Sequence, residues 1–394
     1  MSGLPDIYGE RSSQTPNYTR FGVEFVRGEG AYVYDGDGTE YLDLVCGIGV
    51  NSVGHCHPAV VAAVREQAGT LMHASNLYWT RPAETLARTL AERSFGAKVF
   101  FCNSGAEANE AAIKLARAHA HNAGRPAREI VVLEHAFHGR TFGALSATPQ
   151  EDKQAPFAPL VHGFRTAPRD DAAALAAAID EHTCAVMLEP VQGETGVFVI
   201  SDEVLAAARE ACDAVGALLI FDEVQCGVGR SGSLFAYEQT PVSPDVMTLA
   251  KALGGGLPIG AMVAAESCSA ALRPGYHGST FGGNPVACAA ANAVLGIVAD
   301  PATQQNVKHA TERFTDALRR FGEVGGMGLM IGLELAGDID ANAVVERLLF
   351  DHHVIANATG PSTLRLLPPL LITDRQIDRA LDALTVVLGD APTA

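Results

Sequence analysis

Short apolar runs recur between about residues 98 and 265, and they limit the fold more than any other feature of the sequence. Helix-like stretches at 105–121, 171–181 and 203–214 separate several of these runs. Apolar strands that alternate with helices are typical of a parallel sheet covered on both faces. We therefore expect an α/β fold built on a doubly wound sheet. The runs are AKVFFC, EIVVLE, CAVMLEP, ALLIFDE, DVMTLA and GAMVAA.

The two ends of the chain have other patterns. From 23 to 50, apolar and polar residues alternate around the turn signals GEG and DGDG, which predicts a small antiparallel meander. After about residue 290 the sequence continues with a helical stretch at 286–320, the strand candidates LMIGLEL and STLRLLPPLLI, and an amphipathic helix at 373–388.

These patterns predict the domain organisation. A chain of 394 residues is long for a single core, so one large and one smaller domain are expected. We assign the large domain to residues 56–285. Residues 1–55 and 286–394 should join in a small α+β domain to which both termini contribute.

Charge and cysteine content limit the possible binding partners and the cellular compartment of the protein. The net charge of −17, without clusters of Lys and Arg, makes nucleic acid and anionic lipid poor partners. The eight cysteines form no C-x-x-C pair and several lie in apolar runs, as expected of reduced thiols in the cytosol. No apolar signal region opens the sequence, and no apolar run reaches the ~18–20 residues that span a bilayer. We expect a cytoplasmic protein that binds neither membrane nor nucleic acid.

Polar residues follow the apolar runs where each strand should end, and ligands of such sheets lie beyond these ends. FFC leads into NSGAE, VVLE into HAFHGR, VMLE into PVQGE and LIF into DEVQ. At the first junction, Ser104-x-x-Glu107 fits a capping box, so one interpretation is simply a well-capped helix. The other interpretation is a phosphate-binding site, because free backbone amides and the positive end of a helix dipole suit an anion.

Asp222 closes the apolar run ALLIFDE, so its carboxylate should be largely desolvated and in need of a cationic partner. A protonated pyridine nitrogen would serve, since such a pair keeps the ring in its electron-withdrawing form. The same segment holds a G-x-G-x-x-G pattern at 227–232. We reject a dinucleotide site there, because Pro241 and Pro244 interrupt the long helix that such a site requires.

Lys251 stands in TLAKALGGGLPIGA, directly before the glycines 254–256. One interpretation is an exposed lysine whose stem covers apolar surface. The other is a desolvated amine with a lowered pKa, which can form a Schiff base with an aldehyde cofactor. The glycines would then let the backbone pass close to a flat ring and its phosphate. A phosphate-binding site, a pyridinium partner and an aldehyde acceptor together describe pyridoxal phosphate.

Several motifs, in order along nearly the whole chain, carry a resemblance to a known family. The chain is similar to the subgroup of fold-type-I pyridoxal-phosphate aminotransferases that contains acetylornithine and ornithine aminotransferases. The resemblance implies a large doubly wound, mostly parallel sheet domain and a small α+β domain from both termini. The motifs are FCNSGAEANEAAIKLAR, FHGRT, EPVQGE, FDEVQCGVGRSG, LAKALGGGLPIGA, STFGGNP and LRLLPPL.

The resemblance also implies roles around the cofactor. Lys251 matches the lysine that carries the cofactor and moves the proton, and Asp222 matches the partner of the pyridine nitrogen. Phe137 matches the aromatic residue that stacks on the ring, although a buried core aromatic is equally consistent with the sequence. Further cofactor contacts implied are Ser104, Gly105 and Ala106 for the phosphate, Gln225 for the phenolic oxygen, and His138, Glu189 and Val224 nearby.

Thr280, in GSTFGGNP, matches a threonine that reaches the phosphate of the neighbouring subunit's cofactor. The resemblance therefore implies a homodimer whose active sites are built by two chains, and it leaves open whether the enzyme is a dimer or a tetramer.

Two arginines bear on the substrate. Arg365 resembles the arginine that binds the α-carboxylate of glutamate and 2-oxoglutarate. Arg140 resembles the one that takes their distal carboxylate, or the α-carboxylate of an acylated ornithine. A structural ion pair is the alternative for each. Glu194 resembles a residue that pairs with Arg365 and masks it when the ω-amino substrate binds, which is a hypothesis because desolvation alone would also demand an acidic partner.

The resemblance implies transfer of the δ-amino group of N2-acetyl-L-ornithine to 2-oxoglutarate, a step of arginine biosynthesis. Gly47 leaves a space that suits the acyl group, and Tyr78 and Ser279 are further candidates for substrate contact. Succinylornithine, ornithine, 4-aminobutyrate and a lysine-pathway intermediate remain alternative substrates. A non-catalytic protein that keeps the fold is an alternative of a different class.

His55, Cys56 and His57 form a compact group of potential metal ligands. No second ligand pair at zinc spacing accompanies them, so we expect a turn before a helix that begins at Pro58 and no metal site.

Overall fold

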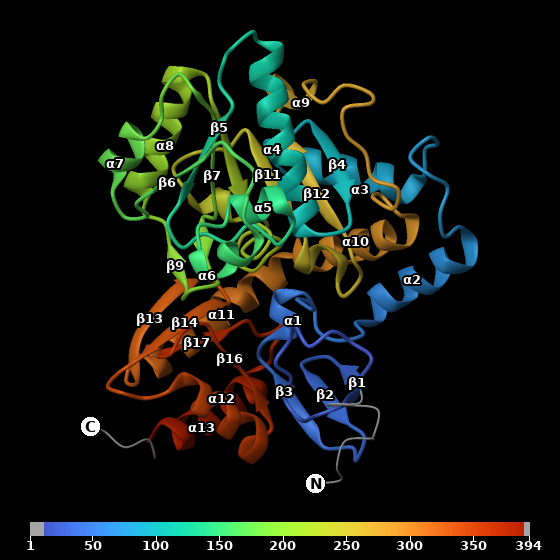
Figure 1. Cartoon of the computed structure of the whole chain (residues 1–394). Coiled ribbons are helices and arrows are strands. Elements are labelled where there is room, and N and C mark those ends of the chain that lie inside the picture. Colours follow the sequence, from blue (N-terminus) through green and yellow to red (C-terminus); the bar gives the residue numbers. More distant parts are fainter. Residues whose placement is uncertain (1–11, 390–394) are drawn as a thin grey trace.

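A computed structural model describes residues 12–389 (Figure 1). Residues 1–11 and 390–394 lie outside the described residues, together with the parts of the predicted termini that fall on them. Within the described residues, no single helix is long and apolar enough to cross a membrane. Two consecutive helices, Pro285–Val298 and Pro301–Leu318, are together long and apolar enough to cross a membrane, but the chain bends by 68° between them.

A seven-stranded sheet forms the upper half of the molecule, in the order β4-β12-β11-β10-β7-β5-β6 (Figure 1). Most neighbouring strands are parallel, which confirms the predicted α/β architecture. The strands are β4 (Lys98–Cys102), β5 (Glu129–Leu133), β6 (Phe164–Ala167), β7 (Thr183–Leu188), β10 (Leu218–Asp222), β11 (Val246–Leu249) and β12 (Gly260–Ala264).

Strand β12 runs antiparallel to both of its neighbours, β11 and β4. The apolar run alone did not reveal this direction. Only residues 250–259 connect β11 to β12, and a parallel crossover needs a dozen or more residues. The chain therefore turns back beside β11, and the turn carries Lys251.

Helices cover both faces of this sheet, and alternate residues of each strand face opposite sides. In β5, Ile130 and Val132 pack with α4, whereas Val131 and Leu133 pack with α7 and α8. The helices on the two faces are α4 (Gly105–Asn122), α7 (Ala172–Ala177) and α8 (Asp202–Val215), close to the predicted stretches. Short elements around this domain are α5 (Phe142–Ser146), α6 (Glu151–Gln154), α9 (Glu266–Ser269), β8 (Val191–Gln192) and β9 (Phe198–Val199).

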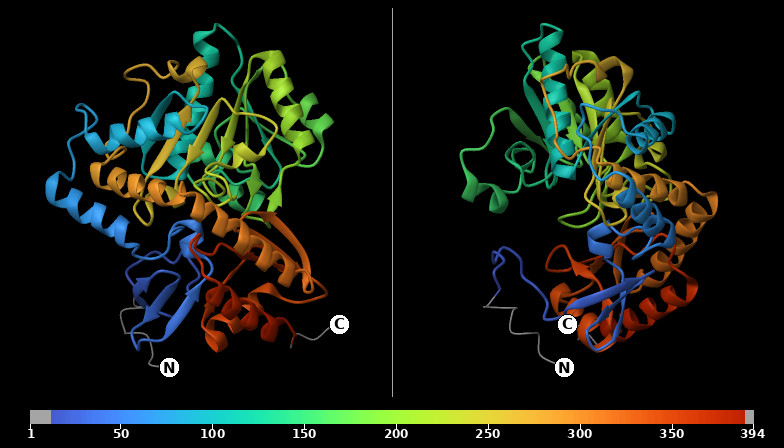
Figure 2. Two further views of the ribbon diagram at one scale, coloured as in Figure 1. Left: turned by 180° about the vertical axis from the view of Figure 1, so that it is seen from behind. Right: turned by 90° about the vertical axis from the view of Figure 1, so that its right-hand side faces the viewer.

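The lower half of the molecule contains two smaller sheets (Figures 1 and 2). The predicted meander is confirmed, and strand β15 from the C-terminal region joins it in parallel to β3. The first sheet holds β1 (Phe25–Glu29), β2 (Tyr32–Asp35), β3 (Glu40–Asp43) and β15 (Val354–Ile355). The second holds β13 (Gly322–Met327), β14 (Met330–Leu335), β16 (Asn357–Ala358) and β17 (Thr363–Leu366). Segments from both ends of the chain thus share one sheet, while the domain boundaries themselves stay a prediction.

The predicted helical stretch at 286–320 is two helices, α10 (Pro285–Val298) and α11 (Pro301–Leu318), bent by 68°. The break arises because Asp300 caps α11 with its side chain and Pro301 occupies the first helical position. Other helices are α1 (Cys46–Gly49), α2 (Pro58–Thr70), α3 (Arg81–Glu92), α12 (Ala341–His352) and α13 (Asp374–Gly389). Sequence analysis did not identify α12.

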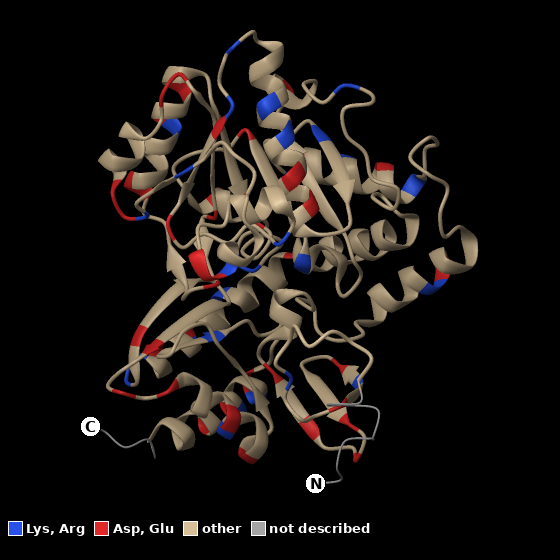
Figure 3. Ribbon diagram, viewed as in Figure 1, with Lys and Arg blue, Asp and Glu red and all other residues tan. Residues whose placement is uncertain are grey.

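Basic and acidic residues are interspersed over the described part of the chain (Figure 3). The expectation that nucleic acid and anionic lipid are poor partners stays a prediction.

Candidate active site

A cavity of about 410 Å³ opens at the carboxyl ends of the parallel strands. The segments after β4, β5, β7, β10 and β11 all contribute to its wall, as expected for ligand sites in such sheets. Its lining includes Asn103, Ser104, Gly105, Ala106, Asn109, Phe137, His138, Arg140, Glu189, Glu194, Asp222, Val224, Gln225 and Lys251.

The N-terminus of α4 supplies amide hydrogens to one side of this cavity. Ser104 is the N-cap, and its hydroxyl accepts from Glu107 N at 3.2 Å. The Glu107 carboxylate takes the amide hydrogen of Asn103 at 2.7 Å rather than that of Ser104, so the predicted capping box forms only in part. Within residues 12–389, no acceptor pairs with the amide hydrogens of residues 104–106. These amides, at the positive end of an 18-residue helix, suit a phosphate.

Gly105 is required at this helix start by close packing. A Cβ on this residue would lie 2.6 Å from the Val224 side chain, which follows β10. The start of α4, which would bind the phosphate, is therefore packed directly against the segment that follows Asp222.

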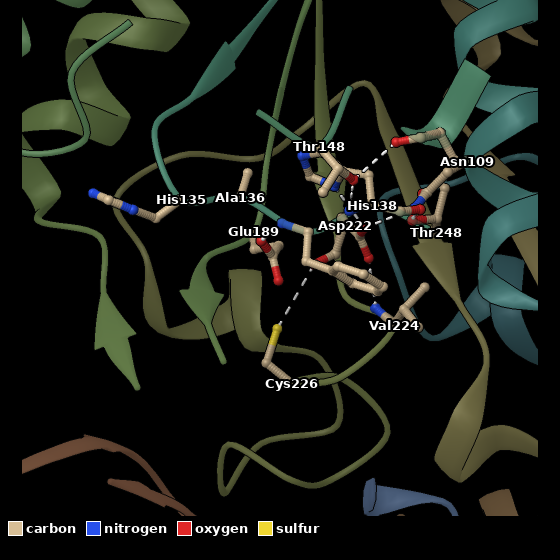
Figure 4. A network of polar contacts seen from close by, with 12 residues as sticks. Asn109, His135, Ala136, His138, Thr148, Glu189, Asp222, Val224, Cys226 and Thr248 are labelled. Carbon is tan, nitrogen blue, oxygen red and sulfur yellow. Dashed lines mark hydrogen bonds and ion pairs between the residues drawn. The ribbon is translucent and has the colours of Figure 1, made fainter. Parts of the chain in front are cut away.

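Asp222 lies at the end of β10, is 3% exposed, and sits in a buried polar network (Figure 4). Its Oδ2 accepts from Asn109 Nδ2 at 2.7 Å and from His138 Nδ1 at 2.8 Å, and its Oδ1 accepts from Val224 N at 3.0 Å. His138 Nε2 is buried and has no partner in the described part of the chain.

Lys251 begins the turn after β11 and has a φ of 37°, a conformation that is strained for a residue with a side chain. Its side chain is partly exposed to the cavity, and Nζ has no hydrogen-bond acceptor among the described residues. Burial, followed by the charge of Arg365, lowers the pKa of the Lys251 ammonium to about 8. The predicted desolvated amine is therefore the interpretation that the geometry favours.

The glycines after Lys251 serve the turn more than the cavity. Gly255 has a φ of 55°, and a Cβ there would lie 2.8 Å from the side chain of Val294 in α10. Gly256 has a φ of 114°, and of the three glycines it is the one that lines the cavity. The expectation that the triplet accommodates a ring and phosphate thus needs correction, since two of the glycines face protein neighbours.

Phe137 and Glu189 form the wall beside Asp222. Phe137 N donates to Glu189 Oε2 at 2.9 Å, which fixes the aromatic residue at the cavity. Burial, and then the negative charge of Asp222, raise the pKa of the Glu189 carboxyl well above its usual value.

Arg365 is 2% exposed and lies behind the cavity wall, on β17. Its Nη1 donates to Gly193 O and, at 3.2 Å, to Gln225 Oε1, and its Nε donates to Asn357 Oδ1 at 3.2 Å. Glu194, which lines the cavity, lies 3.8 Å from the guanidinium. An acidic residue therefore stands in front of a nearly inaccessible arginine.

Arg140 projects from the segment after β5 and is exposed. Its guanidinium lies 5.3 Å from the centroid of the Phe137 ring and lines the same cavity. An exposed cation at the mouth of a cavity is placed to receive a substrate anion.

Besides Arg365, which lies behind the wall, four of the candidate residues do not line this cavity. Tyr78 and Ser279 line a second hollow of about 480 Å³, and Thr280 is exposed on the same loop as Ser279. Ser279 Oγ accepts from Asn103 Nδ2 at 3.2 Å, so this loop reaches the edge of the candidate site. Gly47 lies in the left-handed turn of α1, three residues before Val50, which does line the cavity.

The His55–His57 segment does not gather metal ligands. His55 Nε2 pairs with Asp43 Oδ2 at 2.8 Å, and His57 caps α2, which begins at Pro58 as expected. Among residues 12–389, no group of three or more His, Cys, Asp or Glu side chains could hold a metal ion.

Sequence analysis did not identify Asn109 and Thr248, which complete the network around Asp222. Asn109 is a polar residue on the buried, alanine-rich face of α4, and Thr248 interrupts the apolar run DVMTLA. A polar residue at a core position was the available signal, because such a residue needs a partner.

The residues present fit the pyridoxal phosphate that the resemblance implies. The free amides of residues 104–106 suit its phosphate, and the buried Asp222 carboxylate suits its ring nitrogen. The amine of Lys251 faces the same cavity and lacks a competing acceptor among the described residues.

Comparisons with known proteins agree with this arrangement. The chain matches the class-III aminotransferase family over residues 13–388. It is 47% identical, over 97% of this chain and 98% of the relative, to the acetylornithine aminotransferase of Caldanaerobacter subterraneus subsp. tengcongensis. It is also similar to the crystal structure of N-acetylornithine aminotransferase from Stenotrophomonas maltophilia K279a, with a TM-score of 0.82, 39% identity, and coverage of 93% and 95%. An ornithine aminotransferase structure from Toxoplasma gondii, described with partial occupancy of PLP at the active site, has a TM-score of 0.91, 34% identity, and coverage of 96% and 92%.

Proposed function

The chain belongs to the class-III aminotransferase family, and we propose that it moves the δ-amino group of N2-acetyl-L-ornithine to 2-oxoglutarate with pyridoxal phosphate as cofactor. The products are N-acetyl-L-glutamate 5-semialdehyde and L-glutamate, in arginine biosynthesis. The observation that carries the proposal is that Lys251, Asp222 and the free amides of α4 line one cavity. Relatives named acetylornithine aminotransferase support the choice of substrate.

The proposed mechanism gives separate roles to Asp222, to Lys251 and to the start of α4. When bound, pyridoxal phosphate supplies an electron-withdrawing ring that takes up the negative charge of the substrate carbon that loses its proton. Residues 104–106 would hold the phosphate, and Asp222 would hold the protonated ring nitrogen. Lys251 Nζ would take the proton from the substrate carbon and pass it to C4′ of the cofactor, and a pKa of about 8 suits this exchange near neutral pH.

We propose that Glu194 switches Arg365 between the two half-reactions. In the observed conformation Glu194 lies between the cavity and Arg365. The charge of Arg365 is then offset by that of Glu194, so an uncharged or amine-bearing end of a substrate could bind beside it. A substrate carboxylate would displace Glu194 and form a bidentate pair with the guanidinium.

The Glu194→Ala variant tests this switch through separate pre-steady-state measurement of both half-reactions. We expect the rate constant with acetylornithine to fall while that with glutamate is kept or rises. Glu194→Gln, which keeps the shape but not the charge, should behave like Glu194→Ala. Equal losses in both half-reactions would contradict the switch.

We also propose a homodimer with shared active sites. Residues 77–79 and Phe281 place large apolar side chains on the surface beside the second hollow, and Trp79 is 91% exposed. Exposed apolar patches of this kind mark protein interfaces. Thr280 is exposed on this surface, so it could contact the phosphate of the cofactor bound to a second copy.

Co-expression of Lys251→Ala and Thr280→Asp chains tests the shared site. Each variant alone should be nearly inactive, because one lacks the amine and the other repels phosphate. If Thr280 acts across the interface, mixed dimers contain one intact site, and about a quarter of the native activity should return. No recovery in verified mixed dimers would exclude sharing through Thr280.

A substrate panel tests the proposed reaction. The purified protein is loaded with pyridoxal phosphate and assayed with 2-oxoglutarate and acetylornithine, succinylornithine, ornithine or 4-aminobutyrate. We expect the highest kcat/KM for acetylornithine. A higher value for another amine would reassign the substrate. A cofactor absorbance that glutamate does not change would favour a non-catalytic protein with this fold.

We assign the enzyme to the cytoplasm. All eight cysteines are free thiols in the structure, which fits a reducing compartment.

A further inference from the structure

We propose that Asn109 and Thr248 are positioning residues that decide which oxygen of Asp222 stays free for the ring nitrogen of the cofactor. The inference rests on the proposed function, because it concerns a group that binds through Asp222. It arises from the buried network around that carboxylate, which joins α4, β10, β11 and the segment after β5 (Figure 4).

The orientation of the Asn109 amide is determined by its neighbours. Its Nδ2 lies 2.7 Å from Asp222 Oδ2 and 2.6 Å from His138 O, and both of these atoms can only accept when Asp222 is ionised. The NH2 group must therefore be on this side. Oδ1 then faces Thr248, whose hydroxyl lies 2.7 Å away and must donate. Thr248 thus holds the amide in one direction.

The acceptor positions of Asp222 are then used unequally. A carboxylate oxygen has about two lone-pair positions. On Oδ2, Asn109 Nδ2 and His138 Nδ1 occupy both, whereas on Oδ1 only Val224 N is bound. One acceptor position remains, on Oδ1. The network therefore selects Oδ1 for a ring N–H group and keeps Oδ2 turned into the protein.

Burial makes this selection rigid. Thr248 is 0% exposed and Asn109 is 1% exposed, so water does not compete for their hydrogen bonds. Rotation of the Asp222 carboxylate would leave buried donors of Asn109 and His138 without acceptors, which is unfavourable. The backbone of His138 is held as well, because its N donates to Thr148 Oγ1 at 2.9 Å.

The test measures the affinity of the apoprotein for pyridoxamine phosphate, by calorimetry. This probe has the ring nitrogen and phosphate but no aldehyde, so Lys251 forms no bond with it. We expect Asn109→Leu to weaken binding about tenfold or more and Thr248→Val about threefold to tenfold. Thr248→Ser keeps the hydroxyl and should stay within about threefold of the native protein.

Two controls separate positioning from other effects. Thr183→Val removes a buried hydroxyl from the opposite end of the same sheet, where it accepts from Arg165 Nη2 at 2.8 Å. This variant should lower the melting temperature without changing the affinity for pyridoxamine phosphate. In an Asp222→Ala background, Asn109→Leu should cause little further loss, because Asn109 acts through Asp222.

The outcomes are decisive in either direction. Thr248→Val with native affinity, or a full second loss when Asn109→Leu is added to Asp222→Ala, would overturn the inference. If Asn109→Leu does not fold, the Thr248 pair still provides the test. Failure of the native protein to bind the probe would instead count against the proposed function.

Discussion

At the scale of single residues, the candidate site depends on charged groups that the protein keeps from water. Lys251 and Arg365 both have pKa values below their ordinary values, and burial is the main cause in each case. Asp222 lies in the same region and accepts three hydrogen bonds. The fold thus brings the amine of Lys251 closer to its neutral form, which proton transfer requires, at some cost in stability.

The lowered pKa of Lys251 predicts how the stability of the apoprotein depends on pH. The folded state has a Lys251 pKa of about 8, against the ordinary lysine value of 10.5, so the fold disfavours the protonated amine. This penalty is fully present below pH 8, shrinks as pH rises, and is gone above about pH 10.5. We expect Lys251→Met to stabilise the apoprotein by about 1–3 kcal/mol at pH 7. Chemical denaturation at pH 7 and pH 10 checks this, and a gain that does not shrink with pH would contradict it.

Arg365 predicts a different kind of effect, on one substrate only. Arg365→Lys keeps the charge but loses the planar fork that contacts Gly193, Gln225 and Asn357. We expect KM for 2-oxoglutarate to rise about tenfold to a hundredfold, since charged hydrogen bonds contribute about 1.5–3 kcal/mol. The half-reaction with acetylornithine should change less than threefold. Arg313→Lys, on the surface of α11, is the matched control, and equal effects on both substrates would argue against a carboxylate role.

At the scale of elements, the turn between β11 and β12 positions the reactive amine. The connection is too short for a parallel crossover, so β12 returns antiparallel and the turn remains at the carboxyl edge of the sheet. Gly255 allows this turn to pack against α10.

Gly255→Ala should therefore destabilise the protein. The alanine would have to keep a left-handed backbone conformation, and its Cβ would lie 2.8 Å from the side chain of Val294. Together these two effects should lower the free energy of unfolding by about 1–3 kcal/mol. Gly296→Ala in α10 is the control, because a Cβ there would meet no described atom within 4 Å beyond the adjacent residues and the backbone of its own helix. That change should stabilise the helix by about 0.5–1 kcal/mol. Melting curves of both variants check the prediction, and equal shifts would refute it.

At the scale of the whole molecule, the surface with Tyr78, Trp79 and Phe281 has no cover within the described chain, yet it adjoins the candidate site through Ser279 and Asn103. In the proposed homodimer, a second copy would bury this surface and contribute Thr280 to the site.

The Trp79→Asp variant should therefore dissociate the protein and lose most of its activity, because a buried unpaired charge is strongly unfavourable at an interface. Val386→Asp, an equally drastic change on the exposed side of α13, should leave the molecular mass in solution unchanged. Light scattering after size exclusion gives both masses. A native dimer mass for Trp79→Asp would place the interface elsewhere.

Local patterns were sufficient to predict much of this protein. Apolar runs, cap residues and prolines act within a few residues, so the parallel strands, the start of α4 at Gly105 and the start of α2 at Pro58 were expected. The motifs also pointed to Lys251 and Asp222 as parts of one site, since both lie at the carboxyl ends of strands of the same sheet.

Only the tertiary structure decided the contacts between distant segments. Asn109 and Thr248 are 139 positions apart, and nothing local relates them to Asp222. The resemblance implied a pairing of Glu194 with Arg365, and the structure places the two side chains 3.8 Å apart. It also places Tyr78 and Ser279 outside the main cavity, which nothing local indicates. The physical reason is that secondary structure follows from neighbours along the chain, whereas the geometry of an active site follows from packing between elements.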